Sequence, residues 1–510
     1  MAQILTTNAL LTQQAFAGEL EIPQLSGERE RSERLGEPFF RASKCLILAV
    51  LFLSPLAFGA VEPWAWGIIG LVAACSFMLW ALGSARKGSV RIVWTPLHLI
   101  GIVFLVFAAA QYALRRTQDP AATWEAILKL AADFLIFFLA AQLWDLRAKL
   151  PKDEIRGNAG CMARDENRHH AWGAGAAGPQ PQPGELTRLG LLVSVYTFAL
   201  ALFAILQFFS SHGLIYWRVH PRWGGWVFGP YVNHNHFAGL MEMLIPIAAA
   251  SALAQSGERA KSGRTDRGEE DLARRIWPLG AVLLGLAAVM LSGSRGGLIA
   301  LFVEGLIFMI VIGAAAHLPR RHFTLAALSV VSAVLVFLWL APANIPSRLA
   351  TIAHLPQSPE ATLGQRQAVA VDTLHMFEDH WLTGTGVGSF ETAFTPYLTF
   401  PSDLTWDHAH DDYLEILAET GAVGGLLALV ALAAFLVAVF RRLRAGPASL
   451  DLADSPDWMD HWIRLGAAVG CVGLLVHSLA DFNLHIPANA AWFAMLAGLA
   501  ITGARRVSGV

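Results

Sequence analysis

Two histidines stand among acidic residues in the short segment Asp407–Glu415, which reads DHAHDDYLE. Gly421 follows, and then a strongly apolar stretch over 422–440. Titratable side chains this close to a membrane entrance are costly unless they have a task. A histidine in such a place can take a proton as a general base or position an acceptor hydroxyl. His408 and His410 are therefore the first candidates for chemistry.

Two other interpretations of this segment stay open. His408 and His410 are two residues apart, so their side chains point the same way if the segment is extended. They would then bind a divalent metal ion together with Asp407, Asp411 or Asp412. Alternatively, Asp411 or Asp412 caps the helix that follows. The cap explains an acid but not two histidines, and metal binding is the least favoured interpretation, so we expect no metal site.

Arg295 lies in a short hairpin, residues 292–297, between two apolar stretches. The glycines on both sides of it let the backbone approach a ligand closely. Neighbouring helix ends supply free N–H groups and a positive dipole, and a guanidinium group binds phosphate through two hydrogen bonds. Arg295 is therefore a candidate for binding a phosphate group. The alternative is that its side chain extends to lipid headgroups.

Arg366 opens the segment 366–381, in which apolar residues recur at helical spacing. This pattern predicts an amphipathic helix in a loop, with Arg366 in its first turn. The side chain would bind an anion or, alternatively, form a surface salt bridge. Three glycines follow within 384–388, and they indicate a tight turn rather than a phosphate loop, because no strand-plus-helix context surrounds them.

The elements that must position these residues are membrane helices. The chain has 510 residues, of which 55% are hydrophobic and 15% charged, and its mean hydropathy is +0.49. A soluble domain is about a quarter charged, and a membrane span needs about 20 apolar residues. The sequence therefore predicts an all-α polytopic membrane protein with about 12 transmembrane helices. The expected spans are 45–61, 64–83, 95–114, 124–144, 189–211, 236–255, 276–292, 296–316, 323–341, 421–440, 462–482 and 487–504.

Lys and Arg residues concentrate in alternate loops, which predicts that both termini lie in the cytoplasm. The long, helix-containing loop then lies on the far side of the membrane. The expected parts are a cytoplasmic tail (1–44), transmembrane helices one to nine (45–341) with a cytoplasmic linker (145–188), the far-side loop (342–410) and the last three transmembrane helices (411–510). The four cysteines form no CxxC pair, so neither a disulfide framework nor a zinc ribbon is supported.

This topology brings the unusual polar segments to one side of the membrane. They are the loop 212–236, the hairpin 292–297, the loop 342–410 and the turn 477–485. The first of these segments adds Arg222 and Asn233 as candidates for substrate binding. The net charge of −2 argues neither for nor against an anionic partner, and we expect no nucleic-acid partner.

The segment that contains His410 also carries a resemblance to a known family. His410-Asp411, nine residues, Gly421 and then Gly424 resemble the signature His-[Asn/Ser/Gln]-x9-Gly-x-x-Gly of the O-antigen ligase family. Two positions depart from the pattern. Asp411 replaces the usual Asn, Ser or Gln, and Gly425-Leu426 stands where Thr-Arg often follows the second glycine.

Three further segments carry the same resemblance. Residues 291–297 are similar to the family's Ser-Arg-Gly hairpin, and 366–390 are similar to its Arg-led helix with a Gly-rich turn. Residues 229–239 and the layout of about 12 spans with one long outer loop also fit. The resemblance covers roughly residues 190–440.

The resemblance implies a GT-C-like fold and a metal-independent membrane glycosyltransferase without a cofactor. The donor would be a glycan on undecaprenyl pyrophosphate, and the acceptor a lipid or glycan hydroxyl. The setting would be lipopolysaccharide or other O-antigen-type polysaccharide assembly at the periplasmic face of the bacterial inner membrane, as ligase or polymerase, among membrane lipids. Transfer to a protein by an O-oligosaccharyltransferase is an alternative.

The family roles carry over residue by residue. Arg295 and Arg366 would hold the pyrophosphate, and His410 would activate or position the acceptor hydroxyl. His408 and Asp411 would support the site as substrate-binding residues, with Asp407 or Asp411 orienting the catalytic histidine.

A transporter, for example of bicarbonate, is the competing class. Transporters place ionisable residues in the middle of the membrane and show repeat symmetry. Here most ionisable residues gather at one face, although Glu242 and Glu304 fall inside predicted spans. The transferase is therefore the favoured hypothesis.

Overall fold

The protein is a bundle of α-helices. The computed structural model describes residues 23–90, 92–144, 184–221, 226–262, 268–315, 363–402, 405–444 and 457–502. Within these ranges there are no β-strands apart from two isolated bridges. Nine helices in them are long and apolar enough to cross a membrane, and two shorter helices, Ile276–Ser292 and Pro487–Ile501, are also apolar. The prediction of an all-α polytopic membrane protein is confirmed.

The first helices of the chain are α2 (Pro23–Leu53), α3 (Pro63–Lys87), α4 (Pro96–Ala113), α5 (Pro120–Leu143), α7 (Glu185–Ser210), α8 (His234–Ser262), α9 (Gly268–Ser292) and α10 (Arg295–Ala315). The later ones are α13 (Leu363–Asp379), α14 (Phe390–Phe394), α15 (Asp412–Arg444), α16 (Asp457–His477) and α17 (Pro487–Ile501). Apart from the loop helices α13 and α14, each of these helices overlaps a predicted span. The largest differences are in α2, which begins and ends earlier than the predicted 45–61, and in α15, which begins well before 421. The predicted span 323–341, Arg222 and nearly all of the linker 145–188 lie outside the described residues.

Local sequence explains where several helices begin. Proline is the first residue of α3, α4, α5 and α17, where its fixed φ suits the helix and its missing N–H costs nothing. Asp119 caps α5 by accepting hydrogen bonds from the backbone N–H groups of Ala121 and Ala122, both at 3.0 Å. These starts set the register of the spans.

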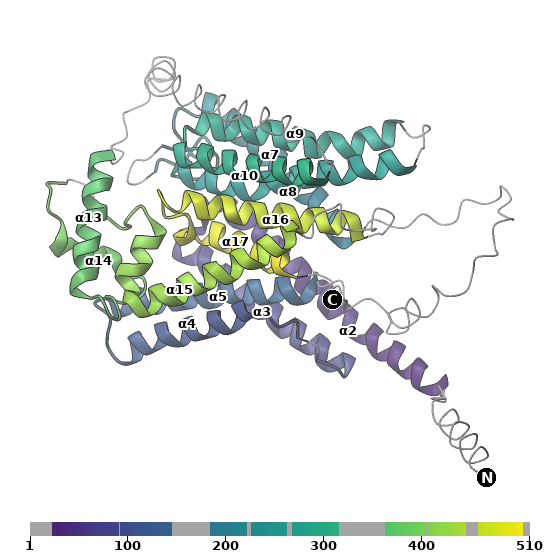
Figure 1. The fold of residues 1–510 in the computed structure, drawn as a ribbon, viewed down its shortest axis with the longest axis horizontal. Helices are drawn as coiled ribbons and strands as arrows, with labels where there is room; N and C mark the ends of the chain where they lie inside the picture. Colours follow the sequence, from purple (N-terminus) through teal and green to yellow (C-terminus); the bar gives the residue numbers. More distant parts are fainter. Residues whose placement is uncertain are drawn as a thin grey trace, which may run out of the picture.

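The helices α8 and α16 form the centre of the bundle, with α7, α9 and α10 on one side and α17, α15, α5 and α4 on the other (Figure 1). In the most apolar stretch of α8, 83% of the residues are buried, against 17% in α4 and α15. Gly466 and Gly470 of α16 lie against the backbone of α8, with Pro246 O and Met243 O below 3 Å from the place where a Cβ would be. Small residues allow this close approach of two membrane helices.

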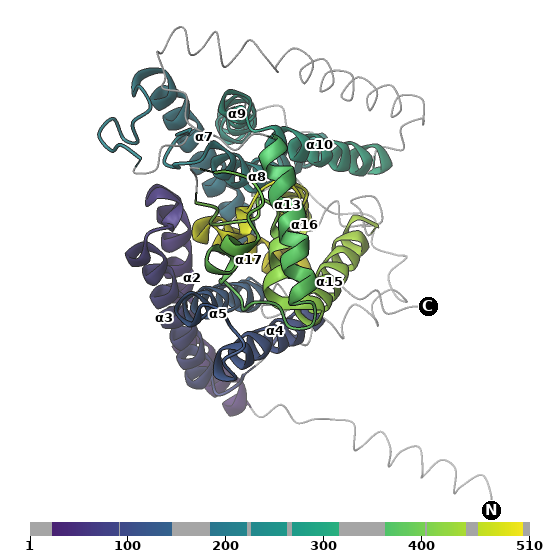
Figure 2. The same ribbon diagram turned by 90° about the vertical axis from the view of Figure 1, so that its left-hand side faces the viewer.

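The helices α13 and α14 gather at one end of the bundle (Figure 1), and α13 crosses in front of the other helices when the molecule is viewed from that end (Figure 2). A small apolar core joins them to the segment before α15. Its buried members include Val369, Met376, Phe390, Phe394 and Trp406. The predicted amphipathic loop helix is thus confirmed as α13.

The glycines of 384–388 form the expected tight turn, which docks on a break in α15. Gly384, Gly386 and Gly388 all have positive φ. Gly421 interrupts α15 with φ 63° and ψ −166°, and a Cβ there would lie 2.5 Å from the backbone carbon of Leu382. The freed backbone groups pair across this contact, for example Ala422 N with Trp381 O at 2.7 Å.

Candidate active site

Residues 477–485, which follow α16, are the place where the candidate residues meet; we call them the 477–485 turn. The backbone N–H of Asp412 donates to Ser478 O at 3.0 Å, so the start of α15 is fixed to this turn. His477 lies against the start of α10, where a Cβ on Gly296 would come within 2.4 Å of its ring. The loop before α15 and the hairpin 292–297 are thereby brought to one end of the bundle.

His410 sits on a strained backbone beside a buried carboxylate. Its φ is +55°, a left-handed value that non-glycine residues adopt at a cost of about 1–3 kcal/mol. Its Nδ1 lies 3.9 Å from Oδ1 of Asp481, and its side chain is 16% exposed. Among the described residues nothing hydrogen-bonds this nitrogen. The ring is therefore partly open and held near an acid without being locked to it.

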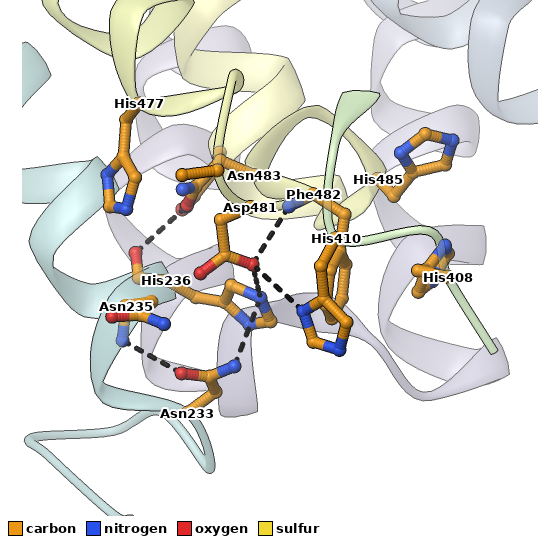
Figure 3. Close-up of polar contacts among 12 residues, drawn as sticks. Asn233, Asn235, His236, His408, His410, His477, Asp481, Phe482, Asn483 and His485 are labelled. Atoms are coloured by element: carbon orange, nitrogen blue, oxygen red, sulfur yellow. Dashed lines mark hydrogen bonds and ion pairs between the residues drawn. The ribbon is translucent and has the colours of Figure 1, made fainter. Parts of the chain in front are cut away.

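Asp481 is the acid between two histidines, as Figure 3 shows. Its side chain is fully buried, and its Oδ1 lies 3.7 Å from Nε2 of His236 and accepts a hydrogen bond from Phe482 N at 2.8 Å. Burial favours the neutral acid, but the neighbouring histidines His236 and His410 outweigh it and hold the pKa of Asp481 well below its usual range. We call His236, His410 and Asp481 the Asp481 cluster.

Asn233 and His236 come to this cluster from the start of α8. The Asn233 Oδ1 accepts a hydrogen bond from Asn235 N at 2.8 Å, as a helix cap does. Its Nδ2 lies 3.5 Å from Nε2 of His236. The backbone oxygen of His236 accepts from Nδ2 of Asn489 at 2.9 Å. Asn233 is thus a neighbour of the site through His236.

The two arginines approach the same turn from different elements. Arg366, on the first turn of α13, donates from Nη1 to Ala480 O at 3.4 Å, next to Asp481. Its buried Nε has no hydrogen-bond partner among the described residues. Arg295 is exposed and is the first residue of α10, next to Gly296, which lies against His477 of the turn. Both positions suit an anionic ligand.

A second cluster of histidines and acids surrounds Glu415. Its Oε1 lies 2.7 Å from His408 Nδ1 and 3.2 Å from His485 Nε2, while its Oε2 accepts from Ala409 N at 2.8 Å. His485 Nδ1 also pairs with Asp412 Oδ1 at 2.7 Å. Burial opposes charge on His485, but Glu415 and Asp412 outweigh it and raise the pKa of His485 to about 10. We call His408, Glu415 and His485 the Glu415 cluster.

Phe482 separates the two clusters. Its ring stacks on His408 with centroids 4.2 Å apart, and it meets His410 and His236 edge-on at 5.0 and 4.7 Å. In Figure 3 His408 and His485 lie apart from the group around Asp481. The two rings do not point the same way, as they would in an extended segment, because the backbone at His410 is left-handed and the rings have different partners.

Asp411 is the cap of α15, which confirms one of the interpretations of this segment. Its Oδ1 accepts from Tyr413 N at 2.9 Å and from Leu414 N at 3.1 Å. This oxygen is used in the cap, and the carboxylate that lies beside the His410 ring is that of Asp481. The sequence showed Asp481 only as part of a polar turn, and its pairing depends on the tertiary contact with His410.

Glu242 lies under the hairpin that carries Arg295. It is completely buried in α8, and its Oε1 is 2.9 Å from Nδ1 of His477. A Cβ on Gly297 would meet the same oxygen at 2.8 Å. The glycines of the hairpin therefore make room for a buried carboxylate–histidine pair, and this pair supports the start of α10.

The arrangement offers a base and an anion site at one end of the bundle. A histidine next to a buried carboxylate can accept a proton from a hydroxyl group. Two guanidinium groups and a helix start can stabilise a leaving phosphate. Residues 280–429 match a family model described as O-Antigen ligase. No curated protein matches the chain. The matched segment contains both arginines and His410, and it ends before the 477–485 turn.

Proposed function

Because residues 280–429 match the O-antigen ligase family model, we propose that the chain moves a glycan from a polyprenyl-pyrophosphate carrier to an acceptor hydroxyl. The family carries the general activity, glycan transfer of ligase or polymerase type in polysaccharide assembly. The carrier, the acceptor and the roles of single residues are part of the proposal.

The observation that carries this assignment is His410 beside the buried Asp481, on a turn that also receives Arg366. The acceptor oxygen attacks the anomeric carbon of the donor sugar, and the bond from that carbon to the phosphate oxygen breaks. The acceptor proton passes to His410, and the lipid pyrophosphate leaves as an anion. Asp481 orients the imidazole ring and stabilises the positive charge that it gains.

The leaving pyrophosphate is the group that needs the arginines. Negative charge grows on it during the reaction, and fixed guanidinium groups stabilise this charge better than water does in a site of low dielectric. Arg366 approaches the Asp481 cluster from α13, and Arg295 stands at the start of α10, beside the glycine that lies against His477. Because these groups supply the positive charge, the transfer step itself needs no metal ion.

We place the reaction at the α13 end of the bundle, facing the periplasm of a bacterial inner membrane, with both termini in the cytoplasm. The donor is a glycan on undecaprenyl pyrophosphate, and the acceptor is a lipid-linked or glycan hydroxyl. The retained alternative within the same chemistry is transfer to a protein hydroxyl.

The test is transfer by purified protein in detergent from a polyprenyl-pyrophosphate glycan to a lipid acceptor, without added divalent metal. Asp481→Asn should lower kcat more than it raises KM, because a positioning residue acts mainly when charge develops on His410. His375→Gln, a change on the exposed face of α13, is the matched control and should keep full turnover. Unchanged kcat in Asp481→Asn would remove the proposed role of this acid.

A further inference from the structure

In the Glu415 cluster the ligand atoms of three side chains lie close enough together to surround one metal ion, and this is not so in the Asp481 cluster. One ligand atom each from His408, Glu415 and His485 lies within 4.8 Å of the others. These atoms come from three separate segments of the chain: the loop before α15, α15 itself and the 477–485 turn. We propose that His408, Glu415 and His485 bind one divalent ion of the zinc type, which ties these three segments together.

The chemistry of the ligands fits such an ion. Two imidazole nitrogens and one carboxylate oxygen form a common zinc set. Zinc–ligand bonds of about 2.0–2.1 Å in a tetrahedron require ligand atoms about 3.3 Å apart. The contacts of Glu415 Oε1 with His408 Nδ1 and His485 Nε2 measure 2.7 and 3.2 Å. Small side-chain movements would therefore suffice to admit the ion.

The groups behind the ligands are also arranged for a metal site. Asp412 Oδ1 lies 2.7 Å from His485 Nδ1, so the other ring nitrogen, Nε2, is the one that binds the ion, which displaces the proton that Nε2 shares with Glu415. A carboxylate behind a metal-binding histidine fixes its tautomer and orientation. The Ala409 N–H holds Oε2 of Glu415 at 2.8 Å, which leaves Oε1 towards the two rings. In both His485 and Glu415, the polar atom that does not face the ion is thus held by a neighbouring group.

The position of the site indicates a structural role. Phe482 stacks on His408 and stands between this cluster and His410. The side chains of His408 and His485 are 24% and 28% exposed, so a water molecule can fill the fourth coordination position. The ion would hold the loop that carries His410 against α15 without joining the transfer step.

The test uses the full-length protein in detergent, stripped with a chelator and dialysed, with zinc sulfate as the probe. The expected result is one zinc ion per chain by elemental analysis and a higher melting temperature on zinc addition. His485→Gln should lose both, whereas His375→Gln should behave as the wild type. No stoichiometric zinc in the wild type, or equal zinc in His485→Gln, would overturn the proposal.

A second variant keeps the test informative if His485→Gln fails to fold. Asp412→Asn keeps all three ligands but changes the group behind His485, and should weaken zinc affinity by about 10- to 100-fold. Equal affinity in this variant and the wild type would contradict the proposed support. His410→Gln should bind zinc normally while losing transfer, so the metal site and the proposed function can fail separately. Transfer that requires zinc would overturn the structural role of the ion and the metal-free transfer step, while leaving binding itself in place.

Discussion

The Asp481 cluster and the Glu415 cluster contain the same kinds of side chain on two sides of one phenylalanine ring, yet their contacts differ. Around Asp481 the histidine nitrogens stay 3.7 and 3.9 Å from the carboxylate. Around Glu415 the contacts are 2.7 and 3.2 Å. The Asp481 cluster leaves its histidine nitrogens beyond ordinary hydrogen-bond distance of the carboxylate, whereas in the Glu415 cluster the histidines and the carboxylate contact one another directly.

The difference separates reactive groups from supporting ones. In the Asp481 cluster, His410 Nδ1, which faces Asp481, and Asp481 Oδ2 have no hydrogen-bond partner among the described residues. The nitrogen that would take the acceptor's proton is then Nε2, on the other side of the ring. Groups that hold segments together gain by satisfying one another, as His408 and His485 do with Glu415. Burial, charge and residue type alone would not separate the two clusters.

The largest expected effect comes from exchanging one histidine in each cluster. His410→Gln should lower kcat for glycan transfer by about 10²–10⁴-fold, the usual contribution of a general base, with little change in melting temperature. His408→Gln should do the reverse and lower the melting temperature more than the rate. Equal losses of rate in the two variants would remove the functional difference between the clusters.

The arginines provide the next largest effect, on the side of the Asp481 cluster. Arg366→Ala and Arg295→Ala should each lower kcat by about 10²–10³-fold, since each removes a fixed donor for the developing charge. The double variant should also bind the pyrophosphate donor more weakly. Arg218→Ala, an exposed arginine in the loop after α7, is the control. Wild-type donor binding in the double variant would exclude this role.

A smaller effect is expected at Gly421, where the glycine turn docks on α15, the helix that carries Glu415. Its φ and ψ suit glycine alone, so Gly421→Ala should cost about 1–3 kcal/mol of stability, measured by thermal unfolding. Gly67→Ala is the control, because the corresponding site in α3 is helical and has no atom within 4 Å of a new Cβ. A stable Gly421→Ala protein would show that the docked turn tolerates a different backbone.

The smallest effect concerns Asp411, which lies between the two clusters. Asp411→Ala removes the cap of α15 and should cost about 0.5–2 kcal/mol, whereas Asp411→Asn keeps an oxygen acceptor and should preserve transfer. Burial, with Asp412 and Glu415 nearby, raises the pKa of Asp411. The carboxylate of the wild type therefore lowers the free energy of unfolding at pH values above its raised folded-state pKa. It has no such effect below about 3.9, the pKa of Asp411 in the unfolded chain.

The difference in stability between Asp411→Asn and the wild type should depend on pH in a defined direction. The stability of Asp411→Asn relative to the wild type should increase as pH rises from about 4 through the raised pKa, and should level off above it. Thermal unfolding at several pH values checks this difference. If instead the wild type became more stable than Asp411→Asn over the same pH range, the charged carboxylate would have a stabilising partner other than the helix cap.

Much of the fold follows from the sequence because each span depends on a local property. Apolar length predicted the membrane helices, helical spacing predicted α13, and the acid before the apolar stretch predicted the cap by Asp411. The cap also accounts for the departure at this position, since Asn, Ser and Asp are all good cap residues. Arg222 lies outside the described residues, so its role stays a prediction.

The rest of the site could not be predicted because it depends on contacts between distant segments. No local pattern joins Asp481 to His410, and nothing in the spacing of His408 and His485 shows that both meet Glu415. The positive φ of His410 arises from this assembly and reverses the expected direction of its ring. The resemblance to the family signature therefore singled out His410 as the candidate base, but no sequence pattern pointed to Asp481 as its acid.

The 477–485 turn has a consequence for how the chain can be divided. A protein cut after Arg444 would retain both arginines, His410 and the whole segment that matches the family. It would lack the carboxylate at His410, the Phe482 ring that contacts His408 and His410, and one ligand of the proposed zinc site. Since α16 also packs along α8 at the centre of the bundle, the segment that matches the family is a sequence unit and not a structural one.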